Sequence, residues 1–80
     1  MRILIVDDDA LVCSSLKTIL EAKNIQVDAI GNSGEEALQL CGHGMPDILL
    51  MDIQMGGISG LEAGERLLRQ YPDAKILFLT

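Results

Sequence analysis

The sequence predicts an α/β fold in which a doubly wound parallel sheet carries helices on both faces. Three observations predict it. Apolar runs of strand length alternate with helical patterns, the first and third runs lack polar alternation, and 49% of the 80 residues are hydrophobic. Continuous apolar strands are typical of sheets buried on both faces. Strands separated by helices imply right-handed crossovers, parallel pairing and helices on the two faces.

The first strand and helix have clear boundaries. Arg2–Val6 is a continuous β-rich apolar run, which predicts a buried strand. Asp9 is expected to cap a helix over Ala10–Lys23, and Asn24 to end it. The expected apolar face of this helix consists of Val12, Leu16, Ile19 and Leu20.

The second strand and helix are shorter. Ile25–Ile30 alternates apolar and polar residues, which predicts an outer strand. Residues 31–34 then form a turn. Ser33 and Glu36 have the spacing of a capping box, so a short helix is expected over Glu35–Cys41.

The second half of the chain repeats this order. Asp47–Asp52 predicts a buried third strand with an acid at its end, and Ile53–Gly60 is a glycine-rich loop. Ser59 and Glu62 form a second capping-box pattern before the third helix. Lys75–Thr80 predicts a fourth strand. The expected apolar positions of the third helix are Leu61, Gly64, Leu68 and Tyr71, and Pro72 follows them.

Composition excludes several classes of function. The formal net charge is −6 and the chain has one Tyr, one Phe and no Trp, which argues against a nucleic-acid-binding surface. No apolar run approaches the roughly 20 residues of a membrane-spanning helix. Cys13 and Cys41 lie far apart without a Cys-x-x-Cys motif. This cysteine usage agrees with a reducing compartment, so we expect a cytoplasmic protein.

Carboxylates gather at the ends of two expected strands. The first strand leads into Asp7, Asp8 and Asp9, and the third ends in Asp52. If these strands are neighbours, Asp7, Asp8 and Asp52 converge at the edge where such sheets bind ligands. Like charges raise one another's pKa, so a hard cation such as Mg²⁺ is expected there. A carboxylate beside Mg²⁺ can accept a phosphoryl group, and the Thr80 hydroxyl can donate to a phosphoryl oxygen.

Four segments, in order and spacing, resemble the receiver domain of bacterial two-component response regulators. These segments are Ile3–Asp9, Pro46–Met55, Gly60–Glu62 and Lys75–Thr80. The resemblance extends over the whole chain and implies a flavodoxin-like receiver fold, here with four strands, three helices and the sheet order 2-1-3-4. It also implies a phosphorylation-dependent switch of a phosphorelay, which is not an enzyme in the ordinary sense although it assists its own phosphoryl transfer and hydrolysis.

The resemblance implies a role for each matching site residue. Asp52 would accept phosphate from a sensor histidine kinase. Asp8, Asp52 and the backbone carbonyl of Gln54 would bind Mg²⁺ directly, and Asp7 would hold it mainly through water. Thr80 would be the switch hydroxyl. The Gln54 side chain would face the water that removes the phosphate.

The sequence departs from the family pattern in two places. Met55-Gly56-Gly57 stands where the family usually has Met-Pro-Gly, and we expect a more mobile loop because glycine lacks proline's fixed φ. The family's further helices, fifth strand, phosphate-binding Lys and switch aromatic would follow Thr80. We therefore expect residues 1–80 to be a truncated receiver domain that self-associates through its exposed fourth strand. Many relatives continue into a DNA-binding domain, so contact with DNA and control of transcription would lie outside this sequence.

Two alternatives from other functional classes remain. A haloacid-dehalogenase-like phosphatase would use Asp7 as its nucleophile, but this reading leaves Asp52 unexplained and has Ala10 where a glycine is expected. A phosphorylation-independent interaction module would keep only the fold. The residue that carries phosphate separates these readings, since it would be Asp52, Asp7 or neither.

Overall fold

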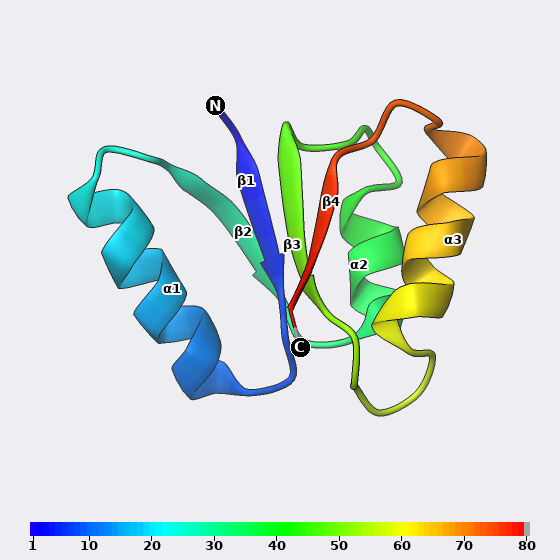
Figure 1. The fold of residues 1–80 in the computed structure, drawn as a ribbon, viewed down its shortest axis with the longest axis horizontal. Helices are drawn as coiled ribbons and strands as arrows, with labels where there is room; N and C mark the ends of the chain where they lie inside the picture. Colours follow the sequence, from blue (N-terminus) through cyan, green and yellow to red (C-terminus); the bar gives the residue numbers. More distant parts are fainter. Residues whose placement is uncertain (80) are drawn as a thin grey trace.

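The computed structural model describes residues 1–79, which form a four-stranded sheet and three helices. The elements in chain order are β1 (Ile3–Val6), α1 (Ala10–Ala22), β2 (Val27–Gly31), α2 (Gly34–Leu40), β3 (Ile48–Asp52), α3 (Gly60–Gln70) and β4 (Ile76–Leu79). The strands lie in the order β2-β1-β3-β4 and all neighbours are parallel, which confirms the predicted topology. Helix α1 covers one face, and α2 and α3 cover the other (Figure 1). No helix within residues 1–79 has the length and apolar character needed to cross a membrane.

Strand β1 lies at the centre of both hydrophobic cores. It pairs with β2 on one side and β3 on the other, and all four of its residues are buried. Ile3 and Ile5 pack on the face of α1, in a cluster with Cys13. Leu4 and Val6 point to the opposite face, as expected from the alternation of side chains along a strand. The second cluster also contains Ala37, Cys41, Leu49, Met51, Ala63 and Leu67.

Each helix begins directly after the residue that the sequence predicts as its N-cap. The Asp9 carboxylate accepts the N–H of Leu11 at 2.9 Å. The N-cap hydroxyls Ser33 Oγ and Ser59 Oγ accept the N–H of Glu36 and Glu62, at 3.0 and 3.1 Å. These bonds satisfy backbone donors that have no partner inside the helix.

The two capping boxes form only in part. Glu36 Oε1 accepts the N–H of Asn32 at 3.2 Å, one residue before the cap. Glu62 forms an ion pair with Arg66 at 2.7 Å, one turn further along α3. The reciprocal bond to the cap N–H is therefore replaced in both helices.

The second strand is shifted from its predicted position at Ile25–Ile30. Ile25 belongs to the turn that ends the first helix and not to the strand, because its N–H donates to the carbonyl of Leu20 at 3.0 Å. Asn24, with φ of 62°, reverses the chain before the strand. At its other end β2 extends to Gly31, which pairs with Val6 of β1. The other predicted bounds that fall within residues 1–79 agree with the observed ones to within one residue, and the predicted strand end at Thr80 lies outside the described residues.

The predicted apolar faces of two helices are partly wrong. In α1, Cys13 is the buried residue, whereas Val12 and Ile19 are 37% and 54% exposed. In α3, Leu61 and Leu68 are 52% and 39% exposed. The buried residues of α3 are Gly60, Ala63, Gly64 and Leu67.

Small residues explain the orientation of α3. A Cβ at Gly64 would lie 2.7 Å from the ring atom Cζ of Phe78. The helix backbone therefore approaches β4 more closely than a leucine-lined face would allow. Close approach extends the van der Waals contact of the helix with the sheet.

Candidate functional site

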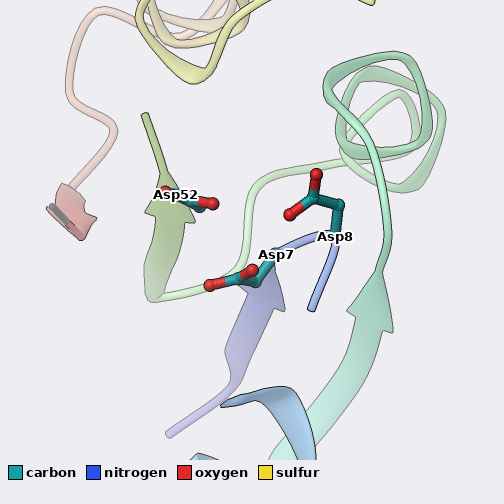
Figure 2. A group of neighbouring side chains, drawn as sticks. All are labelled: Asp7, Asp8 and Asp52. Carbon is teal, nitrogen blue, oxygen red and sulfur yellow. The ribbon is translucent and has the colours of Figure 1, made fainter. Parts of the chain in front are cut away.

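The acidic residues meet where two paired strands end. Strands β1 and β3 pair in register, with Val6 opposite Met51, so the residues that follow lie side by side. Figure 2 shows Asp7 and Asp8 at the end of β1, and Asp52 at the end of β3. One carboxylate oxygen from each of the three residues lies within 4.8 Å of the others.

Asp7 is fixed and almost enclosed. Its side chain is buried, and its Oδ1 accepts the N–H of Asp9 at 2.8 Å. Its own N–H donates to the carbonyl of Gly31 at 3.1 Å. Burial raises the pKa of Asp7, and the negative charges of Asp52 and Asp8 raise it further, against the opposing effect of the Asp9 hydrogen bond. The carboxylate therefore carries an unfavourable charge that a nearby cation would stabilise.

Asp52 is the half-buried carboxylate of the group, while Asp8 is exposed. Asp52 is the last residue of β3, where it pairs with Leu79 of β4. Its Oδ1 accepts the N–H of Gln54 at 3.2 Å, which restricts the orientation of the carboxylate. The three acids open into a hollow of about 440 Å³ that also reaches Val12, Leu16 and Leu79.

The donor set fits a divalent cation that prefers oxygen. All three ligand candidates are carboxylates, and an exposed side of the hollow leaves room for water and a further oxygen ligand. Mg²⁺ is typically bound by one or two carboxylates together with waters and phosphate oxygens. Nitrogen and sulfur ligands, which Zn²⁺ favours, are absent from this cluster.

Two further residues, Gln54 and Thr80, belong to the predicted site. Gln54 lies two residues after Asp52 and is exposed, and its N–H donates to the Asp52 carboxylate. The roles assigned to its carbonyl and side chain stay predictions. Thr80 lies outside the described residues, so its role as switch hydroxyl also stays a prediction.

The sequence interpretation missed the apolar rim of the hollow. The sequence predicts Val12 on the core face of the first helix, yet it is 37% exposed and lines the hollow beside Asp9. Its position three residues after the N-cap was the available signal, because the first turn of α1 must lie next to the strand end that precedes it.

Comparison with known families identifies the type of domain. The response regulator receiver domain family matches residues 3–80. The response regulator GacA of Pseudomonas viridiflava is 42% identical over 81 aligned residues, which cover 100% of this chain and 38% of GacA. This chain therefore spans less than half the length of that curated relative.

Solved structures agree with this match. The response regulator TrrA of Thermotoga maritima, in complex with Mg²⁺-BeF, has 40% identity and a TM-score of 0.92 over 99% of this chain and 68% of that one. TrrA in complex with the histidine kinase ThkA has 40% identity and a TM-score of 0.89, over 99% and 67% of the two chains.

Proposed function

This chain belongs to the response regulator receiver domain family, and we propose that it is a switch in which Asp52 accepts a phosphoryl group from a sensor histidine kinase. Receiver domains are signalling domains of two-component systems and not classical enzymes. The observation that carries the proposal is the half-buried Asp52 carboxylate, which faces Asp7 and Asp8 across the hollow (Figure 2). The complex of TrrA with a histidine kinase supports the class of partner.

The acidic cluster would hold Mg²⁺. Asp8 and Asp52 would bind the ion directly with the backbone carbonyl of Gln54, and the buried Asp7 would act mainly through water. Bound Mg²⁺ would neutralise the clustered carboxylates and the oxygens of the transferring phosphoryl group. The Mg²⁺-BeF complex of TrrA supports this assignment.

Phosphoryl transfer would use the free oxygen of Asp52. This oxygen attacks the donor phosphorus and forms an O–P bond, while the bond from phosphorus to the kinase's histidine nitrogen breaks. The electron pair stays on that nitrogen. The Asp52 oxygen that accepts the Gln54 N–H is held in place, so the carboxylate presents its other oxygen to the donor. Thr80 would donate its hydroxyl to a phosphoryl oxygen, and the Gln54 side chain would face the hydrolytic water.

The difference in burial between Asp7 and Asp52 argues against the phosphatase alternative. Asp7 is 5% exposed and already accepts a backbone hydrogen bond. A nucleophile has to reach the donor phosphorus, and Asp52 is the more accessible of these two carboxylates. The geometry therefore favours Asp52 over Asp7 as the phosphoacceptor.

The wider setting forms part of the same proposal. Residues 1–80 would be the N-terminal part of a receiver domain in a longer cytoplasmic protein. Its output would be transcription control through a DNA-binding domain outside this sequence. The full length of GacA, of which this chain covers 38%, supports a longer parent protein.

The test is to expose the protein to acetyl phosphate with Mg²⁺ and to map any phosphoryl group by mass spectrometry. We expect one group on Asp52 and none in Asp52→Asn, with Asp9→Asn as a control that removes a neighbouring charge. A group on Asp7 would favour the phosphatase reading. No group on the folded protein would favour the phosphorylation-independent interaction module.

A further inference from the structure

Gly60 lies directly against the peptide group of Asp52. It is the buried first residue of α3, and its N–H donates to the carbonyl of Ile53 at 2.9 Å. A Cβ at Gly60 would overlap the carbonyl oxygen of Asp52 and lie 2.8 Å from its carbonyl carbon. The same Cβ would be 3.0 Å from Cα of Ile53. No side chain fits at this position unless backbone moves.

The peptide between Asp52 and Ile53 is also held from its other side. The N–H of Ile53 donates to the carbonyl of Leu79 at 3.1 Å, which continues the pairing of β3 with β4. The end of β3 is therefore enclosed between β4 and the first turn of α3. Its position depends on how closely α3 approaches.

Helix α3 itself has little freedom to retreat. Its first turn is capped by Ser59, and Ala63 and Leu67 are buried in the core against the sheet. Gly64 places the helix backbone against the ring of Phe78. A methyl group at residue 60 would press on the Asp52–Ile53 peptide, and because α3 is held by these contacts, the resulting strain would act on the end of β3, where Asp52 lies.

We propose that Gly60 is a positioning residue for Asp52. Its missing side chain lets α3 fix the Asp52 peptide, and this sets the direction of the Asp52 carboxylate toward Asp7 and Asp8. The importance of Asp52 rests on the proposed function, whereas the effect of Gly60 on the geometry does not.

Three glycine-to-alanine variants separate positioning from packing. Gly60→Ala changes the contact with Asp52. Gly64→Ala places its methyl group against the side chains of Phe78 and, at 3.8 Å, Met51, so it disturbs side-chain packing of the same helix and not the peptide group of Asp52. Gly56→Ala adds its methyl group to open space. Two properties are measured for each folded protein. One is its affinity for Mg²⁺, and the other is the set of amide NMR shifts of residues 52–54 in the absence of metal.

We expect Gly60→Ala to move the amide shifts of residues 52–54 and to weaken Mg²⁺ binding about tenfold, as the loss of a residue that orients a metal ligand typically does. Gly64→Ala should be destabilised but should keep Mg²⁺ affinity close to that of the unmodified protein. Gly56→Ala should change neither property. If Gly60→Ala folds poorly, the same measurements are made in a stabilising osmolyte.

The proposal is overturned if Gly60→Ala binds Mg²⁺ no more weakly than Gly64→Ala, or if it stays unfolded in osmolyte, because the strain is then not relieved at Asp52. If the unmodified protein takes no phosphoryl group on Asp52 but the metal-free shifts move only in Gly60→Ala, the proposed function fails and the positioning role stands.

Discussion

The phenolic hydroxyl of Tyr71 donates a hydrogen bond of 3.0 Å to the backbone carbonyl of Cys41. Tyr71 is the C-cap of α3, and Cys41 is the C-cap of α2. The bond therefore joins the ends of the two helices that cover the same face of the sheet.

Tyr71→Phe should lower the free energy of unfolding by about 1 kcal/mol, the usual contribution of one such hydrogen bond. The Phe ring keeps the packing of Tyr71 and removes only the hydroxyl, which leaves the carbonyl of a buried residue without this donor. Chemical denaturation of both proteins measures the difference. Equal midpoints and slopes would show that water replaces the hydroxyl at no cost.

Gly57→Ala should destabilise the loop after β3 by roughly 1–2 kcal/mol, because Gly57 has φ of +77° and a side chain is strained there. Its Cβ would also lie 2.6 Å from Oε2 of Glu35, the carboxylate that accepts the Ile58 N–H at 3.4 Å.

Gly56→Ala is the matched control for this loop. A Cβ at Gly56 meets no atom within 4 Å, so the unfolding free energy should change by no more than about 0.5 kcal/mol. Thermal denaturation of both variants makes the comparison. If Gly56→Ala and Gly57→Ala lose the same free energy of unfolding, the strain does not arise from the positive φ of Gly57.

Asp7→Asn should stabilise the metal-free protein by on the order of 1 kcal/mol, since it removes one of three clustered charges. The folded pKa of Asp7 is raised above its usual 3.8. The folded state therefore binds the proton more tightly than the unfolded state, and this group makes stability fall as pH rises from 3.8 through the folded pKa. Asp7→Asn should lose that pH dependence, together with part of the stabilisation by Mg²⁺.

Asp9→Asn is the control for this charge effect. Asn also caps helices well, so the cap of α1 persists while one nearby charge is removed. Melting temperatures with EDTA and with Mg²⁺, followed over pH, provide the measurement. If Mg²⁺ raises the melting temperature of Asp7→Asn as much as that of the unmodified protein, Asp7 does not contribute to binding the ion.

Leu77→Lys should reduce self-association. Strand β4 forms one edge of the sheet in the described residues, and its Leu77 is 56% exposed. A charge on an edge strand opposes pairing with a second copy. Leu11→Lys adds the same charge to α1 instead of to the edge strand, at a leucine that is 74% exposed. Sedimentation at micromolar concentrations should show association that only Leu77→Lys weakens, and a monomeric unmodified protein would refute the edge as a contact.

The strands could be predicted from patterns along the chain, whereas their order 2-1-3-4 was implied by the resemblance to receiver domains, and the meeting of Asp7, Asp8 and Asp52 depends on that order. Apolar runs mark the strands, and parallel pairing brings their carboxyl ends to one edge. The three N-caps followed from single residues whose side chains bond locally.

The faces of α1 and α3 could not be predicted in the same way. Hydrophobic periodicity places Leu61, Gly64 and Leu68 on one core face, but only Gly64 of these is buried, against Phe78, and the two leucines are exposed. Which face packs depends on the distance between helix and sheet, and this distance is a property of tertiary contacts. The contact of Gly60 with the carbonyl of Asp52 could not be predicted for the same reason, because it also depends on tertiary structure.

The central position of β1 has a consequence for the order in which parts of the molecule open. Its residues are buried on both faces and its backbone pairs on both sides, so deuterium should replace its amide protons last. Asp7 follows β1 directly and is tied to β2 through Gly31. Fluctuations that fray α2 or the outer strand β4 break neither of these links, so Asp7 should remain ordered until β1 or β2 opens.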